Sequence, residues 1–150
     1  MSDSFDEFAD NLQDKIYSEL RKIYSSEALA RWINPDNIGP IENPDAHGRL
    51  TGRCGDTMEI FLDFQENRVK KATYMTDGCA SSNMCGSFAA AMAMGKNPDE
   101  LAEITGETIL NKIGRLPEED THCAFLAAQT LHEALDAFMK KQMKNKRKLL

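Results

Sequence analysis

Hydrophobic side chains recur every three or four residues near the start of the chain, the spacing of one face of a helix. Ser4 and Glu7 form a capping-box pair there, so we expect an amphipathic helix from Ser4 to about Tyr24. A short helix is expected at residues 27–32 and has to stop there, because turn-forming Asn-Pro pairs follow at 34–35 and 43–44. Trp32 is expected to be a core anchor, with an exposed aromatic that serves a partner as the alternative. The apolar positions of the first helix are Phe5, Phe8, Leu12, Ile16, Leu20 and Ile23.

Strict alternation replaces this spacing in the middle of the chain. Met58, Ile60, Leu62 and Phe64 are separated by single residues, which is typical of a strand with one buried face. A turn at 65–68 leads into a returning strand at 69–76, and residues 49–53 form a possible earlier strand. We therefore predict a small antiparallel meander.

Helical patterns dominate the remainder of the chain. We predict helices at residues 81–94 and 106–113, another that starts at Pro98, and a long one from 121 to about 144. A helix followed by three strands and then several helices predicts an α+β fold: a small antiparallel three-stranded sheet with helices packed on one face and a long C-terminal helix.

Length and charge refine this picture. With 150 residues and 41% hydrophobic side chains, the chain fits one domain with a sizeable core, which we place at residues 1–139. Residues 140–150 hold six of the 18 basic side chains and no acid, so the first 139 residues carry a net charge of -12. This acidic body argues against nucleic-acid binding. The basic end is read as a solvated helix end or tail, with docking to an acidic partner as the alternative.

Cysteine usage points to metal or thiol chemistry. The N-terminus is acidic where a signal peptide would be basic, and no long apolar run follows, so we expect a cytoplasmic protein without a membrane span. Four cysteines in that reducing compartment are not expected to form structural disulfides.

Three of these cysteines stand at the ends of predicted elements. Cys54 precedes a strand, while Cys79 and Cys123 open helices, where unpaired backbone N–H groups favour a thiolate. Cys85 lies six residues after Cys79, about 240° around a helix, and is expected to be a core residue, with a smaller chance of serving the site as an auxiliary thiol.

Three thiolates with one oxygen or nitrogen ligand suit either zinc or an iron–sulfur cluster. The fourth donor could be Asp56, two residues after Cys54, or His122, next to Cys123. A hard carboxylate in a soft site binds more weakly than a thiolate, which is useful in a protein that must release its cargo.

Several short motifs follow one another along about residues 24–140: Tyr24-Ser25, Asn34-Pro35, Asn37, Gly39, Cys54-Gly55-Asp56, Gly78-Cys79, Leu116-Pro117 and His122-Cys123. In their order and approximate spacing they resemble the NifU/IscU iron–sulfur scaffold family. The resemblance implies transient assembly of a 2Fe-2S cluster, sulfur supplied by a cysteine desulfurase, and transfer to apoproteins. It also implies Cys54, Cys79 and Cys123 as ligands, with Asp56 and His122 as the labile or exchanging ones.

Two features depart from the family pattern. Asp120 stands where many members have a lysine, in the segment that docks a DnaK-type chaperone, so the resemblance leaves that partner open. Residues 1–23 form an extra N-terminal helix, and the chain lacks the further modules of longer NifU proteins, so it resembles a stand-alone scaffold.

Two other functions compete with this interpretation. A binding module could hold a permanent zinc at the same cysteines, although closed structural zinc sites rarely use a carboxylate such as Asp56. A thiol enzyme could use His122 and Cys123, but neighbours on a helix point about 100° apart, so we expect no enzymatic activity. The sequence leaves open a homodimer and whether a cluster lies within one chain or between two.

Overall fold

The computed structural model describes residues 2–149 and shows an antiparallel sheet in the order β1-β2-β3. The strands are β1 (Ala46–Thr51), β2 (Thr57–Gln65) and β3 (Arg68–Thr76). Short connections make such a meander the simplest way to pair three successive strands. The predicted α+β fold with a three-stranded sheet is confirmed.

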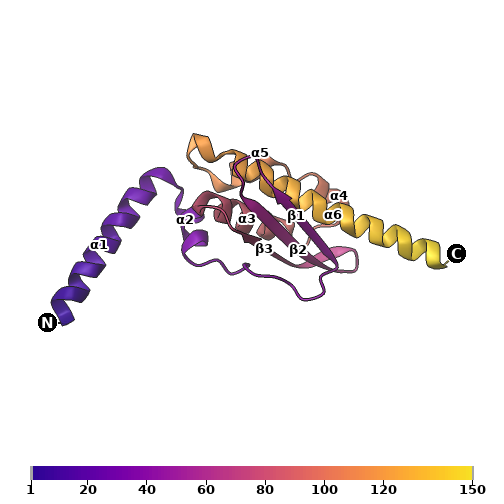
Figure 1. The fold of residues 1–150 in the computed structure, drawn as a ribbon, viewed down its shortest axis with the longest axis horizontal. Helices are drawn as coiled ribbons and strands as arrows, with labels where there is room; N and C mark the ends of the chain where they lie inside the picture. The colour runs from indigo at the N-terminus through magenta and orange to yellow at the C-terminus, as the bar shows by residue number, and fades with distance from the viewer. Residues whose placement is uncertain (1, 150) are drawn as a thin grey trace.

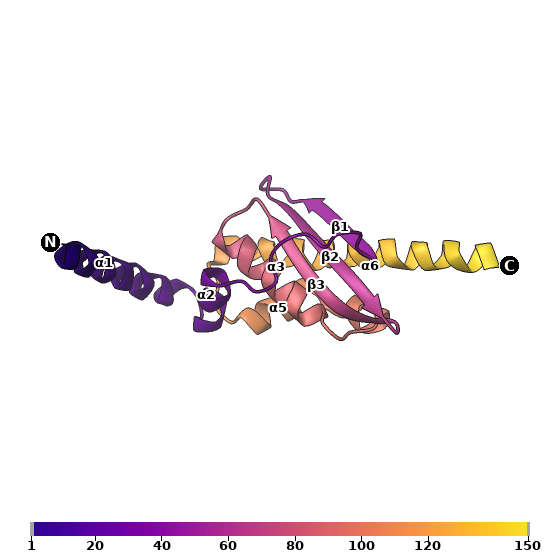
Figure 2. The ribbon, with the colours of Figure 1, turned by 90° about the horizontal axis from the view of Figure 1, so that it is seen from below.

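Helices lie both before and after the sheet along the chain, and α3 and α6 pack against one of its faces (Figure 2). Helices α3 and α6 contact the strands, and the shorter α4 and α5 lie against α6. The bounds are α1 (Ser2–Ile23), α2 (Ser26–Ile33), α3 (Ala80–Ala93), α4 (Pro98–Ala102), α5 (Gly106–Ile113), a 3-10 turn (Glu118–Asp120) and α6 (His122–Leu149).

The core forms between the sheet and helices α3 and α6. The alternating Met58, Ile60 and Leu62 of β2 are fully buried, as the period of two predicts. Small residues let the layers approach closely: a Cβ on Gly86 of α3 would stand 2.7 Å from the ring of Tyr74 on β3. Packing of this kind holds the starts of α3 and α6 at one end of the sheet.

Several predicted details need correction. The first strand spans Ala46–Thr51 instead of residues 49–53, because Ala46 pairs with Leu62 and the chain turns away after Thr51. Helix α6 continues to Leu149, five residues beyond the predicted end, where strong helix formers such as lysine predominate. Trp32 is 38% exposed and so is no core anchor.

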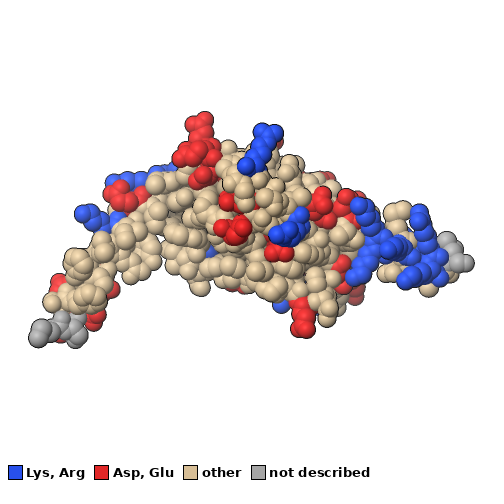
Figure 3. Space-filling view, in the orientation of Figure 1, with Lys and Arg blue, Asp and Glu red and all other residues tan. Residues whose placement is uncertain are grey.

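Helix α1 projects from the body, and the basic end of α6 extends from the opposite end of the molecule (Figures 1 and 3). The helix begins at Ser2, so Ser4 lies in its first turn and is not its cap. Its apolar face exists as predicted, but Phe5, Phe8 and Leu12 on it are exposed. In the part of the chain that the structure describes, no helix is long and apolar enough to cross a bilayer.

Candidate metal centre

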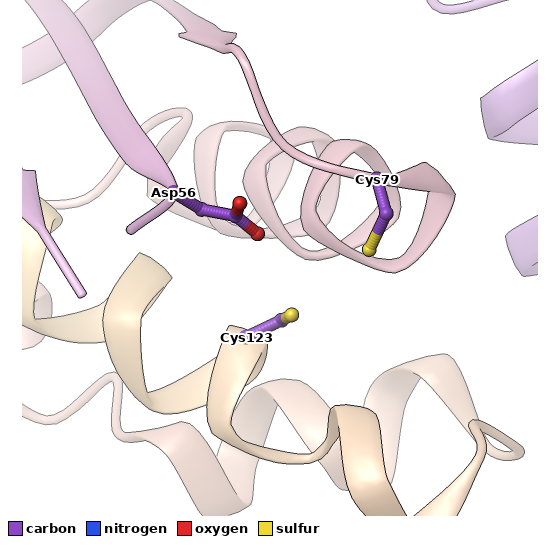
Figure 4. A group of neighbouring side chains, drawn as sticks. All are labelled: Asp56, Cys79 and Cys123. Atoms are coloured by element: carbon purple, nitrogen blue, oxygen red, sulfur yellow. The ribbon is translucent and has the colours of Figure 1, made fainter. Parts of the chain in front are cut away.

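Asp56, Cys79 and Cys123 converge at one end of the sheet (Figure 4). A carboxylate oxygen of Asp56 and the two Sγ atoms all lie within 4.8 Å of one another. Asp56 immediately precedes β2, Cys79 immediately precedes α3, and Cys123 lies in the first turn of α6. Three segments far apart in sequence thus supply one oxygen and two sulfur donors, a combination that suits a transition metal.

A tight turn between β1 and β2 positions Asp56. The Gly52 N–H donates to the Asp56 carbonyl at 2.8 Å, and the Gly55 N–H donates to the Gly52 carbonyl at 3.0 Å. Gly55 has a φ of 90°, a conformation that other residues rarely adopt. The turn places Cys54 at its exposed tip and Asp56 at its base.

Cys79 is positioned by a loop that is tied to the start of β2. The Thr57 N–H donates to Asp77 Oδ1, and Thr76 Oγ1 donates to the Thr57 carbonyl, each at 2.7 Å. Cys79 is the N-cap residue of α3 but makes no side-chain capping bond. Its thiol therefore remains available beside the positive end of the helix dipole.

Cys123 is buried, and its environment disfavours the thiolate. Burial raises the pKa of Cys123 to about 11, a hydrogen bond with Ser82 works in the opposite direction, and the nearby Cys79, Asp120 and Cys54 raise it. The thiol is therefore protonated near neutral pH. A metal ion that binds Cys123 has to displace this proton.

Cys54 and His122 lie beside this group of three and not within it. Both are exposed and line an open hollow of about 720 Å³, together with Arg53 and Phe125. His122 Nε2 is 3.7 Å from Cys123 Sγ, and its Nδ1 is 3.0 Å from the Glu119 carbonyl oxygen. The ligand roles of Cys54 and His122, like those of the three converging residues, stay predictions.

Cys85 occupies the core. It is fully buried in the middle of α3, and burial strongly raises its pKa. Among the described residues, the group of possible metal ligands does not include it. Its location agrees with the predicted packing role.

The model of the NifU-like N terminal domain family matches residues 23–145 of this chain. The chain belongs to this family. Relatives of this NifU-like domain include the iron-sulfur cluster assembly scaffold protein IscU 1 of Archaeoglobus fulgidus, which is 34% identical over 123 residues, covering 81% of this chain and 80% of that protein. The protein IscU of Aquifex aeolicus, also described as an iron-sulfur cluster assembly scaffold, is 29% identical over 79% of this chain and 78% of its own length.

Solved structures show the same NifU-like fold. The crystal structure of a nitrogen-fixing NifU-like protein (N-terminal) from Brucella abortus superposes with a TM-score of 0.63 at 20% identity, covering 81% of this chain and 98% of that one. A putative scaffold protein for the SUF system from Fervidobacterium islandicum gives a TM-score of 0.60 at 19% identity, covering 76% of this chain and 97% of that one. Helix α1 lies almost entirely before the part matched by the family model.

The structure of this NifU-like domain adds two residues that sequence reasoning missed. Ser82 is fully buried and contacts Asp56 Oδ2 and Cys123 Sγ of the converging group. Ser81 donates to Asp120 Oδ2 at 2.8 Å, which ties the segment before α6 to α3. The spacing in the sequence could have indicated Ser82. It lies three residues after Cys79, and residues three apart on a helix share a face.

Proposed function

We propose that this protein is a scaffold on which an iron–sulfur cluster is assembled transiently and from which it passes to apoproteins. The convergence of Asp56, Cys79 and Cys123 within 4.8 Å is the observation that carries this proposal. Membership of the NifU-like family supports it, because relatives that span most of this chain are named iron-sulfur cluster assembly scaffold proteins.

The donor set suits a cargo that must leave. The proposed ligands are Cys54, Cys79 and Cys123, with Asp56 and His122 as exchanging donors, and the proposed cargo is a 2Fe-2S cluster. Thiolates bind iron strongly, whereas the hard carboxylate provides a weaker bond that an acceptor thiol can replace. The exposure of Cys54 and His122 at the hollow gives an acceptor a route to this edge of the site.

The partners follow from this chemistry and from the family. A cysteine desulfurase would supply sulfur, and cytoplasmic apoproteins would receive the cluster. We assign no DnaK-type chaperone, because Asp120 replaces the lysine of the family pattern and its carboxylate accepts a hydrogen bond from Ser81. A local role as an anchor for the start of α6 accounts for Asp120.

The proposed role of Asp56 as an exchangeable ligand can be tested by cluster transfer. Wild type and Asp56→Ala are reconstituted without oxygen to equal iron content, and transfer to an apo-ferredoxin is followed by visible absorption. We expect slower transfer from Asp56→Ala and longer survival of its cluster in air, because the exchangeable donor is lost. Asp99→Ala, which removes a carboxylate from the first turn of α4, is the matched control and should behave as wild type. Faster loss of the cluster from Asp56→Ala without slower transfer would contradict the proposal.

Zinc is the second candidate occupant, since it accepts the same donors and binds more tightly than iron(II). A module with a permanent zinc would keep the metal during anaerobic incubation with iron and sulfide and would develop no visible absorption. A scaffold would acquire the absorption of a cluster. Elemental analysis of the same samples separates the two functions.

A thiol enzyme has weaker support. The 3.7 Å between His122 Nε2 and Cys123 Sγ is the contact such an enzyme would use. However, nucleophilic cysteines need a depressed pKa, and burial raises that of Cys123 to about 11. The environment of Cys123 therefore favours a ligand over a nucleophile.

A further inference from the structure

One buried hydroxyl group contacts all three members of the converging group. Ser82 Oγ donates to Asp56 Oδ2 at 3.0 Å and lies 3.3 Å from Cys123 Sγ and 3.9 Å from Cys79 Sγ. Ser82 has no solvent-exposed surface, so water does not compete for these contacts. The three donors thus meet around a single side chain from the first turn of α3.

The number of protons determines how this hydroxyl is used. An ionised carboxylate only accepts hydrogen bonds, and a serine has one proton to donate. The Ser82 proton is therefore available to Asp56, to which the Ser82 hydroxyl donates at 3.0 Å.

The glycine before Cys79 provides the space for this contact. A Cβ on Gly78 would lie 2.6 Å from Ser82 Oγ and 2.7 Å from Asp56 Oδ2. Such distances are far below ordinary van der Waals contact, so a larger residue would push Asp56 and Ser82 apart. The contact between Ser82 and Asp56 therefore depends on a glycine at position 78.

We infer that Ser82 is a positioning residue that orients the Asp56 carboxylate toward Cys79 and Cys123 and so raises the metal affinity of the site. This inference rests on the proposed function. Ser82 does not itself need to bind the metal. Its hydroxyl restricts the carboxylate to the orientation in which an oxygen faces the two sulfur atoms.

A second serine of the same helix supplies a matched control. Ser87 is as fully buried as Ser82, but its hydroxyl donates to Asn37 Oδ1 at 2.9 Å, away from the site. Replacing either serine by alanine removes one buried hydroxyl from α3. Only the change at Ser82 touches the donor group.

The experiment measures the affinity of the full-length protein for Zn²⁺ alone, by competition with a chromophoric chelator. Loss of an outer contact to a metal ligand costs roughly 10-fold or more in affinity, so we expect about a 10-fold loss for Ser82→Ala and none for Ser87→Ala. In an Asp56→Ala background, the further change Ser82→Ala should have a clearly smaller effect, because the carboxylate that it orients is absent. A merely structural role would give the same factor in both backgrounds.

Binding of Co²⁺ provides a spectroscopic readout, since its visible bands report the donors around the ion. We expect Ser82→Ala to move these bands toward those of Asp56→Ala. Gly78→Ala perturbs the same contact from the loop and should lower the Zn²⁺ affinity in the same direction, which keeps the test available if Ser82→Ala does not fold.

Unchanged affinity or tighter binding in Ser82→Ala, or an equal loss with and without Asp56, would overturn the inference while leaving the scaffold function standing. Failure of the wild-type protein to acquire a cluster on reconstitution would instead contradict the proposed function. The two failures are thus seen in different samples.

Discussion

At the scale of single residues, the cysteines differ in burial and in position, and these two properties set their chemistry. Cys79 begins α3 and is exposed, whereas Cys85 lies less than two turns later in the same helix and is fully buried in the core. Cys123 is buried as well, but its sulfur faces Asp56 and Cys79. The chemistry of each thiol therefore depends on the group it faces and not on burial alone.

Single substitutions test this division. We expect Cys54→Ser, Cys79→Ser and Cys123→Ser each to abolish stable cluster formation, because each removes a proposed thiolate donor. Cys85→Ala should retain the cluster and lose only about 1 kcal/mol of unfolding free energy, a typical cost for a small change in a core. Iron and sulfide content after anaerobic reconstitution is the measurement. Loss of the cluster from Cys85→Ala alone would show that the assignment of ligands is wrong.

At the scale of elements, close packing of strand on helix determines where the donors lie. A Cβ on Gly48 of β1 would overlap the carbonyl oxygen of Thr130 and lie 2.6 Å from the Ala134 nitrogen, both in the backbone of α6. This contact and its neighbours fix α6 against β1. They thereby fix the start of α6, with Cys123, near the turn after β1, with Cys54.

Gly48→Ala should destabilise the protein by about 1–3 kcal/mol, the usual cost of overpacking a core, because the backbone of α6 cannot move aside as a side chain can. Gly52→Ala is the control, since its Cβ would meet the flexible side chain of Leu126 at 3.3 Å and the Asp56 carbonyl oxygen at an ordinary contact distance of 3.8 Å. Denaturant unfolding monitored by circular dichroism gives both values. Equal stability of the two variants would contradict the close β1–α6 packing.

In helix α1, by contrast, we expect a substitution to have little effect on stability. Phe8 is 63% exposed on α1, whereas Phe88 is 1% exposed in α3. Phe8→Ala should change the unfolding free energy by no more than about 0.5 kcal/mol, as surface substitutions do. Phe88→Ala should cost about 3–5 kcal/mol because it leaves a cavity. A large loss in Phe8→Ala, measured by the same unfolding experiment, would mean that the apolar face of α1 is covered in solution.

At the scale of the whole molecule, the site brings together three segments that lie far apart in the sequence. Its donors come from the β1–β2 turn and from the starts of α3 and α6. A metal that binds all of them stabilises the folded chain, since the unfolded chain cannot hold the same donors together. Lys and Arg side chains gather at the end of the molecule that the last turns of α6 form (Figure 3).

Zinc binding should therefore raise the melting temperature. A metal concentration 100 times the dissociation constant contributes about 2.7 kcal/mol. For a chain of this length, that corresponds to an increase of about 5–10 °C, which chelation should reverse. Differential scanning calorimetry with and without a chelator measures it, and Cys79→Ser should show almost no shift. An unchanged melting temperature after verified zinc loading of the wild type would count against a site shared by the three segments.

The sequence by itself determined the helices, the strands and the residue types of the site, because periodicity, capping and turn chemistry act between residues close together in the chain. It predicted a core position for Cys85 from its angle on the helix, and it offered Asp56, two residues after Cys54, and His122, next to Cys123, as alternative fourth donors. Only the tertiary structure decided that Trp32 and the apolar face of α1 are exposed, and that Ser82 stands at the centre of the donor group. These facts depend on which distant segments pack together, and no local pattern encodes the distance between the β1–β2 turn and the starts of two helices.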